Sequence, residues 1–139
     1  MTFGTRDTKE IIEQGLTFAP KFDEHGLIPA VAIDAQTSEP LMLAYMNEES
    51  LKQTLEKGQA VYWSRSRNQL WHKGATSGEF QVVVEIRTDC DQDALILRVN
   101  QMGGGCCHTK ARTCFYRSVP FGKELAADET AAVPLVRQP

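Results

Sequence analysis

The sequence predicts an α+β protein with a mixed, strongly bent β-sheet and few helices. Segments of strand length that are rich in apolar and branched residues recur along the 139 residues. Complete start and stop signals for a helix frame residues 48–57. Two branched runs, 80–88 and 94–101, would together far exceed the usual strand length of about 5 to 6 residues, so the chain must bend between them.

The first part of the chain predicts a polar lead-in followed by a hairpin. Residues 1–17 form the lead-in, which we expect to be partly helical. We expect its helical part to be closed near Pro20. Its short apolar stripe, interpreted as a docking face, consists of Ile11, Ile12 and Leu16. Residues 27–34 and 40–46 are apolar runs separated by a turn-rich segment, which indicates two paired strands.

The predicted helix over residues 48–57 begins after Asn47, a good N-cap, and ends at Gly58. Strand character returns at 60–63. Residues 64–78 have no helical or alternating period, so we expect a loop that carries polar side chains.

The chain as a whole is expected to form one domain over residues 1–139. The tail, residues 120–139, is polar and alanine-rich, and we expect it to be loosely attached.

The composition limits the classes of function. A net charge of −3 gives no long-range attraction to nucleic acid or to an anionic membrane, so we expect neither as a partner. The chain has no apolar run of membrane-spanning length and no export signal at its start, which favours a cytoplasmic protein. In a reducing compartment, four clustered cysteines favour metal binding or catalysis over disulfides.

Three carboxylates at alternate positions, Asp89, Asp91 and Asp93, offer the hard oxygen ligands that Mg²⁺ prefers. In a straight strand the outer two would lie about 13 Å apart. Direct binding by all three therefore requires the chain to bulge or turn there, and otherwise one carboxylate acts through water. The alternative is a solvated acidic hairpin tip without a metal.

The thiols suggest a second, softer metal. On a helix, Cys107 and Cys114 would lie about 10 Å apart along the axis, whereas tetrahedral zinc needs sulfurs about 3.8 Å apart. The segment between them must therefore loop back, with slack supplied by glycines 103–105. Three thiolates would leave one zinc position open for water, as in a catalytic site. Cys106 is either an alternative ligand or a small buried residue, and we favour the second.

Several motifs closely resemble the phosphoribosyl-AMP cyclohydrolase family, from about Phe18 to Val119. They are Leu-Ala-Tyr-Met-Asn at 43–47, Tyr-Trp-Ser-Arg-Ser at 62–66, Leu-Trp-His-Lys-Gly-x-Thr-Ser-Gly at 70–78, Asp-Cys-Asp-x-Asp at 89–93, Cys-His-Thr at 107–109 and Cys-Phe-Tyr-Arg at 114–117. The resemblance implies hydrolysis of the adenine ring of phosphoribosyl-AMP in histidine biosynthesis. It also implies zinc, magnesium and an interlocked homodimer with its sites between subunits.

Residue by residue, the resemblance implies two metal sites and an acid or base. Zinc would bind Cys90, Cys107 and Cys114, with one thiolate donated across the dimer interface, and magnesium would bind the three aspartates. His108 would be the nearby acid or base. The chain departs from the family at two positions: Lys110 stands where glycine is usual, and Cys106 where alanine is common.

The chemistry of these residue types agrees with that reading. Opening the ring between N1 and C6 needs a hydroxide at neutral pH, which zinc provides by lowering the pKa of water toward about 7. His108 is the expected proton carrier, although it could instead only hydrogen-bond a thiolate or a backbone group. His72 is a weaker second candidate.

The segment 62–78 could hold the two phosphates and the flat base of such a substrate. The candidate ligands are Arg65, Arg67 and Lys73 as cations, Thr76, Ser77 and Gly78 as a turn with hydroxyl and N–H donors, and Trp71 as a stacking surface. The alternative is an ordinary solvated basic loop, in which the tryptophans serve packing.

Two other classes of function fit less well. A zinc deaminase needs His-x-Glu followed by Pro-Cys-x-x-Cys, and neither motif is present. A zinc-stabilised binding module without enzymatic activity would explain the thiols, but it predicts four protein ligands and gives the aspartates no role.

Overall fold

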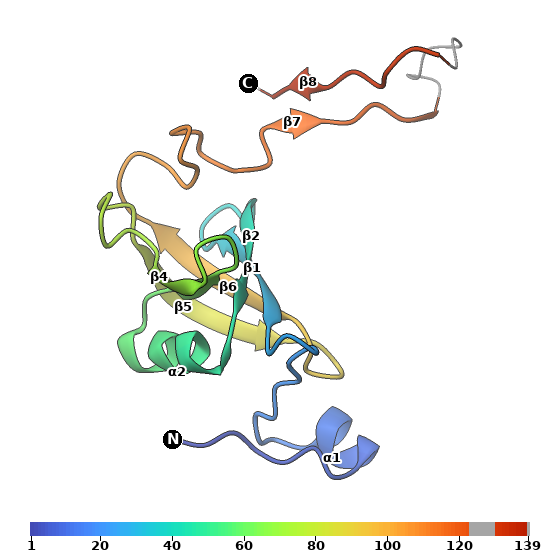
Figure 1. Ribbon diagram of the computed structural model, residues 1–139, viewed down its shortest axis with the longest axis vertical. Coiled ribbons are helices and arrows are strands. Elements are labelled where there is room, and N and C mark those ends of the chain that lie inside the picture. Colours follow the sequence, from blue (N-terminus) through green and yellow to red (C-terminus); the bar gives the residue numbers. More distant parts are fainter. Residues whose placement is uncertain (123–129, 139) are drawn as a thin grey trace.

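The computed structural model describes residues 1–122 and 130–138 and contains a mixed, six-stranded sheet (Figure 1). The strand order is β4-β3-β2-β1-β6-β5. The bounds are β1 Ile28–Asp34, β2 Pro40–Met46, β3 Val61–Ser64, β4 Gln69–His72, β5 Gln81–Thr88 and β6 Leu95–Gln101. Strands β1 and β6 are parallel and the other neighbours are antiparallel, so the predicted mixed sheet is confirmed.

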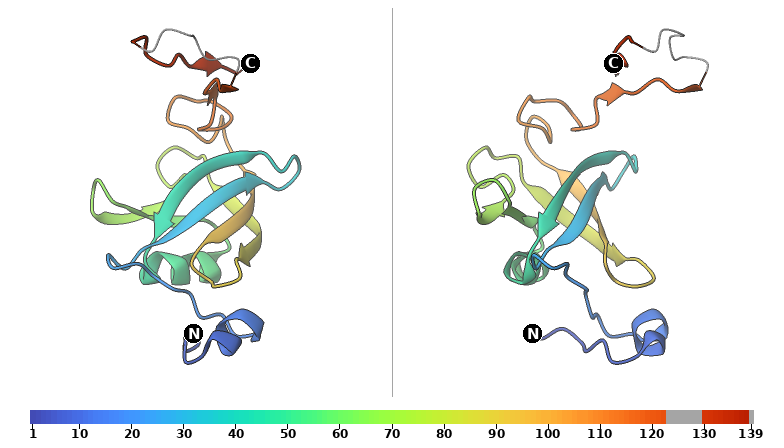
Figure 2. Two further views of the ribbon diagram at one scale, coloured as in Figure 1. Left: turned by 90° about the vertical axis from the view of Figure 1, so that its right-hand side faces the viewer. Right: turned by 45° about the vertical axis from the view of Figure 1, so that its right-hand side comes forward.

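The sheet curls strongly into a half-barrel (Figure 2). An isolated antiparallel bridge joins Gln59, just before β3, to Val82 in β5, and the Ala60 N–H donates to the Gln81 carbonyl over 3.0 Å. Strands from the two halves of the sheet therefore come back toward each other. The small residues Ala30 and Ala32 of β1 are fully buried inside this curl, where only short side chains allow the backbones to approach.

The predicted hairpin and the predicted second helix are both confirmed. Strands β1 and β2 pair antiparallel, and buried positions alternate along β1 as period-two patterning requires. Helix α2, Glu48–Lys57, begins after Asn47, whose side chain accepts from the Ser50 N–H, and ends at Gly58 with a φ of +68°. It packs against β2 and β3 with Leu51 fully buried.

The structure corrects two expectations. The predicted loop 64–78 contains β4, which pairs with β3 at the edge of the sheet. This strand escaped prediction because an exposed edge position requires no apolar alternation. The first helix, α1 at Lys9–Gln14, ends at the cap Gly15 and not near Pro20, which leaves Leu16 beyond the helix and fully exposed.

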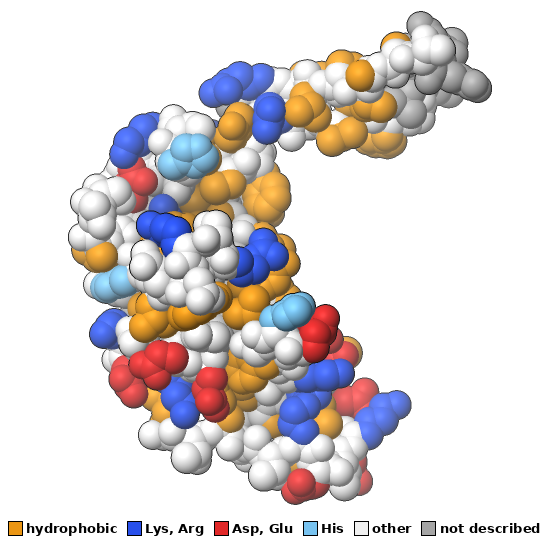
Figure 3. Space-filling model, in the orientation of Figure 1, with side chains coloured by type: hydrophobic (Ala, Val, Ile, Leu, Met, Phe, Trp, Pro, Cys, Tyr) orange, Lys and Arg blue, Asp and Glu red, His pale blue; other side chains and the backbone are white. Residues whose placement is uncertain are grey.

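The C-terminal part of the chain forms an arm that leaves the curled sheet (Figures 1 and 3). Its two short strands, β7 at Arg117–Ser118 and β8 at Val136–Arg137, pair antiparallel. The expected loose tail falls partly on residues 123–129, which lie outside the described residues. No described helix has the length and apolar character needed to cross a membrane.

Candidate active site

The three aspartates lie together in the turn between β5 and β6, as the bend argument predicted. Their ligand oxygens all lie within 4.8 Å of one another, and all three residues are exposed. The turn is closed by the Gln92 N–H, which donates to the Asp89 carbonyl, and by the Asp93 and Ala94 N–H groups, which donate to the Asp89 carboxylate. Three carboxylates gathered in this way could hold a divalent cation.

Contacts within the cluster change the pKa of Asp89 and of Asp93. Hydrogen bonds with Asp89 and Asp91 raise the pKa of Asp93 to about 6. Partial burial raises the pKa of Asp89, but hydrogen bonds from Asp93 and from the backbone outweigh it, so the net shift is downward. Without a cation, Asp93 therefore takes up a proton below about pH 6.

The N-terminal lead-in holds this turn in place, a role that sequence reasoning missed. Gln92 has a left-handed backbone with φ +57°, and its side chain is buried. The amide accepts from the Ala19 N–H and donates to the Ile12 carbonyl, each over 2.8 Å. Arg6 donates to the Asp91 carbonyl over 2.8 Å. In the sequence, Gln92 stands out only as the one residue of the 89–93 motif that is not a candidate metal ligand.

The thiol loop, residues 103–114, folds back on itself as the zinc argument required. Both the Cys106 and the Cys107 N–H groups donate to the Ala111 carbonyl over 3.2 Å. Gly105 makes this possible, since it adopts φ +144° and a Cβ there would lie 2.7 Å from the Ala111 oxygen. The loop contains no helix, and Cys107 and Cys114 line the same cleft.

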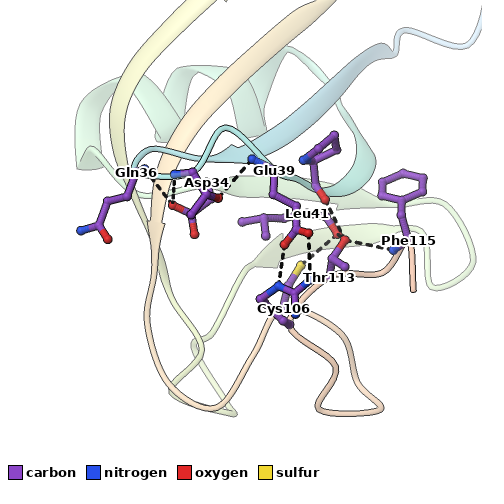
Figure 4. Close-up of polar contacts among 10 residues, drawn as sticks. Asp34, Gln36, Glu39, Leu41, Cys106, Thr113 and Phe115 are labelled. Carbon is purple, nitrogen blue, oxygen red and sulfur yellow. Dashed lines mark hydrogen bonds and ion pairs between the residues drawn. The ribbon is translucent and has the colours of Figure 1, made fainter. Parts of the chain in front are cut away.

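Contacts with the β1–β2 hairpin anchor the far end of the thiol loop (Figure 4). Arg112 makes two hydrogen bonds of 2.6 and 2.8 Å to the Glu39 carboxylate. The Thr113 hydroxyl donates to the Pro40 carbonyl over 2.7 Å, and the Cys114 N–H donates to the Leu41 carbonyl over 2.7 Å. The hairpin therefore fixes the position of Cys114.

The cysteines of this loop differ in their surroundings. Partial burial raises the pKa of Cys107, but hydrogen bonds from the Thr109 hydroxyl, from backbone N–H groups and from Cys114 outweigh it and leave the pKa below its usual value. Although Cys114 as a residue is exposed, desolvation of its sulfur and the nearby Cys106 and Cys107 raise its pKa to about 12. Both sulfurs are soft donors, and each would have to give up its proton to bind a cation such as zinc.

Cys106 is buried, as favoured from the sequence, with 2% of its surface exposed. Its sulfur lies 3.5 Å from the Leu41 carbonyl oxygen and 3.9 Å from the Cys114 sulfur. It therefore packs directly beneath the thiols that the resemblance assigns to zinc.

A cleft of about 500 Å³ lies between the thiol loop and the loop of residues 73–79. Most of the predicted site residues meet there. Those that line it are Arg67, Trp71, Lys73, Thr76, Ser77, Cys107, His108 and Cys114. Arg65 instead lines an adjoining pocket of about 600 Å³ that shares Arg67 and Trp71, and its guanidinium stacks 4.0 Å from the centre of the Tyr45 ring.

The 73–79 loop is a tight turn built on two glycines. Gly74 has φ +92°, and a Cβ there would collide with the backbone N of Phe80 at 2.2 Å. The Gly78 N–H donates to the Gly74 carbonyl over 2.7 Å, so Gly78 shapes the turn and its own N–H is already used. The exposed Thr76 and Ser77 lie at its tip.

The two histidines considered from the sequence occupy different settings. The His108 Nδ1 lies 3.9 Å from the Cys107 sulfur, at the cleft. The half-buried His72 side chain is hydrogen-bonded to Gln59 over 2.7 Å and packs against Phe80. Of these two histidines, His108 is therefore the one that lies beside the thiols in the cleft.

Cys90 does not join the other thiols within this chain. It lies in the acidic turn before β6, whereas the thiol loop follows the other end of β6 (Figure 1). Seven strand residues span about 20 Å, so the two ends are far beyond a shared coordination sphere. In the described part of the chain, the three aspartates are the only set of three or more potential metal ligands gathered at one point.

These features define a class of protein. A curled α+β sheet carries thiols and an imidazole beside a basic cleft, together with an acidic turn that can hold a cation, and such a combination is typical of hydrolases that activate water. The family model for phosphoribosyl-AMP cyclohydrolase matches residues 42–116.

Curated relatives agree with that match, and each is named phosphoribosyl-AMP cyclohydrolase. The protein of Brucella anthropi is 61% identical over 112 residues, which cover 80% of this chain and 79% of the relative. That of Rhodopseudomonas palustris is 53% identical over 111 residues, with coverages of 80% and 74%. That of Brucella canis is 59% identical over 112 residues, with coverages of 80% and 81%. The chain belongs to the phosphoribosyl-AMP cyclohydrolase family, a family of hydrolases.

Proposed function

We propose that the protein hydrolyses the N1–C6 bond of the adenine ring of phosphoribosyl-AMP, giving the formimino-aminoimidazole carboxamide ribotide of histidine biosynthesis. Family membership supports the substrate. The observation that carries the proposal is that Cys107, Cys114 and His108 line one cleft with Arg67 and Lys73. Such a cleft joins a water-activating donor set to cationic groups suited to phosphate.

Two metals fit the donor chemistry. Zinc would be held by Cys107 and Cys114 together with Cys90 of a second copy, since the Cys90 of the same chain lies at the far end of β6. Magnesium would be held by Asp89, Asp91 and Asp93. When bound, zinc supplies Lewis acidity that makes water nucleophilic at neutral pH. The protein would act as a cytoplasmic homodimer whose sites are shared between subunits.

The chain's own residues would bind and orient the substrate. Arg65, Arg67 and Lys73 would attract the phosphates, and the Thr76 and Ser77 hydroxyls would donate to them from the turn that Gly78 shapes. The half-buried Trp71 reaches both pockets and would stack on the base.

His108 would move the proton. Its imidazole lies at the cleft beside Cys107, so it can accept a proton from the attacking water and return it to the ring nitrogen. The thiol loop turns sharply around the Ala111 carbonyl. The position of the His108 imidazole therefore depends on the fold of this loop and not on a helix or strand.

The test is an absorbance assay of ring opening with purified protein, before and after zinc chelation. We expect chelation and Cys107→Ser each to abolish turnover, because each removes part of the soft donor site. The matched control is Cys106→Ala, which removes a neighbouring buried sulfur and is expected to retain activity within about threefold.

Counting ligands separates this enzyme from a zinc-stabilised binding module. X-ray absorption of the zinc-loaded protein should show three sulfurs and one light atom, since an exchangeable water must occupy the fourth position. Four sulfurs, with Cys106 as the fourth, together with no turnover in the wild-type protein, would support the binding module instead.

A further inference from the structure

Two lysines connect the walls of the cleft. Lys73, in the 73–79 loop, is 6% exposed, and its ammonium donates to the Cys106 carbonyl over 2.7 Å. In the opposite direction, the Lys110 ammonium of the thiol loop lies 2.6 Å from a carboxylate oxygen of Glu79. Each loop therefore holds the other through a charged hydrogen bond, the stronger kind in proteins.

The Glu79 carboxylate is buried and requires a positively charged partner. Its side chain is 4% exposed and lies beneath the glycine run, where a Cβ on Gly103 would be 2.8 Å from the Glu79 Cγ. A buried carboxylate needs a compensating charge, because its desolvation is otherwise costly. Lys110 provides that charge and, with Lys73 nearby, lowers the pKa of Glu79.

Lys110 adopts a backbone conformation that needs support. Its φ of +67° is left-handed, which non-glycine residues adopt at some cost and retain where surrounding contacts impose it. The side-chain contact that holds Lys110 is the ion pair with Glu79. The rest of the Lys110 side chain lies largely in solvent, and 67% of it is exposed. The Lys110 N–H also donates to the Cys107 carbonyl over 2.8 Å, so a shift at Lys110 moves Cys107 and His108.

We propose that Glu79 and Lys110 are positioning residues, and that their ion pair, the 79–110 latch, holds Cys107 and His108 in place at the cleft. The latch closes the thiol loop onto the 73–79 loop, and the Lys73 bond reinforces it. Its effect on catalysis rests on the proposed function, whereas its effect on loop order does not.

The test combines hydrogen exchange with kinetics. Lys110→Met and Glu79→Gln should each speed amide exchange in residues 103–114 about tenfold, without changing exchange in strand β1. Each should also lower kcat/KM for ring opening about tenfold. The double variant should be no worse than the poorer single variant, because the two residues act as one unit. Lys110→Arg, which keeps the charge, should restore both quantities to within about twofold of wild type.

Lys9→Met is the matched control. It removes the lysine of an exposed ion pair with Glu13 in α1, and we expect wild-type exchange and kinetics. Wild-type exchange in the thiol loop of Lys110→Met and Glu79→Gln, or losses that multiply in the double variant, would overturn the latch. Absence of ring opening in the wild-type protein would instead refute the proposed function, and the exchange measurements would still decide the latch.

Discussion

At the scale of single residues, the carboxylates of the acidic turn link protonation to the capacity for binding a cation. Three carboxylate oxygens that converge within 4.8 Å repel one another, and below about pH 6 a proton on Asp93 relieves this repulsion. A divalent cation can replace that proton and satisfy all three groups at once. The raised proton affinity of Asp93 and the capacity for a cation are therefore two consequences of the same geometry.

We expect one carboxyl of the acidic turn to titrate near pH 6 in the metal-free protein. Carbon NMR of the Asp93 carboxyl should give a pKa of about 6. Because the folded chain then binds this proton more tightly than the unfolded chain does, the contribution of Asp93 to the free energy of unfolding is present below about pH 4. It declines as the pH rises through about 6.

Asp93→Asn provides the control for this titration. It should remove that part of the pH dependence measured by urea unfolding, and added Mg²⁺ should lower the apparent pKa of Asp93 in the wild-type protein. A pKa near the ordinary 3.8 would mean that the three carboxylates are farther apart in solution.

At the scale of secondary structure and loops, the thiol loop depends on glycine at the position where the chain passes closest to itself. Gly105→Ala would place a Cβ 2.7 Å from the Ala111 oxygen at a φ of +144°. We expect a loss of about 1 to 3 kcal/mol in the free energy of unfolding, since the site must either strain or open.

Gly122→Ala is the comparison for this variant, because Gly122 also has a positive φ, of +61°, but a Cβ there would meet no atom within 4 Å. The thermal unfolding temperature and the affinity for zinc should both fall in Gly105→Ala, and much less so in Gly122→Ala. Equal effects in the two variants would show that backbone conformation alone, and not the contact with Ala111, limits the loop.

The same scale shows what the sequence could and could not predict. The β1–β2 hairpin, α2 and the bend at the aspartates follow from local patterns of apolar residues, caps and strand length, and the structure confirms them. Strand β4 has no such pattern, because an exposed edge strand is fixed by its pairing with β3. The Lys110–Glu79 contact joins residues 31 apart in sequence, and no local signal marks it.

The site residues divide in a similar way. Residue types and spacings marked the aspartates and thiols as candidate ligands, since metal chemistry selects few side chains. Gln92 was missed because its role is to hold the backbone of the turn through contacts with the distant lead-in. Side chains that position others leave a weaker signal than side chains that bind.

At the scale of the whole molecule, the length of β6 separates two groups of candidate ligands. One end of the strand carries Cys90 and the aspartates, and the other end leads to Cys107 and Cys114 (Figure 1). A symmetric dimer in which two chains run past each other would bring the Cys90 end of one chain to the thiol loop of the other. The same two-fold operation would complete both sites.

Mixing two inactive variants tests this arrangement directly. Cys90→Ser and Cys107→Ser should each be inactive alone, because each lacks one sulfur at every site. After joint unfolding and refolding at equal amounts, half of the dimers should contain both variants, and each such dimer has one intact site. The mixture should therefore recover about a quarter of wild-type activity in the ring-opening assay.

The control is a mixture of Cys107→Ser with Cys114→Ser, whose missing sulfurs belong to the same thiol loop. If zinc takes both of these sulfurs from one chain, each site in the mixed dimer still lacks one of them, and no activity returns. Recovery in this control, or none in the Cys90→Ser mixture, would show that the sulfurs are not divided between subunits in the proposed way. The distance along β6 makes the first mixture the decisive one, because it leaves a single chain unable to complete its own site.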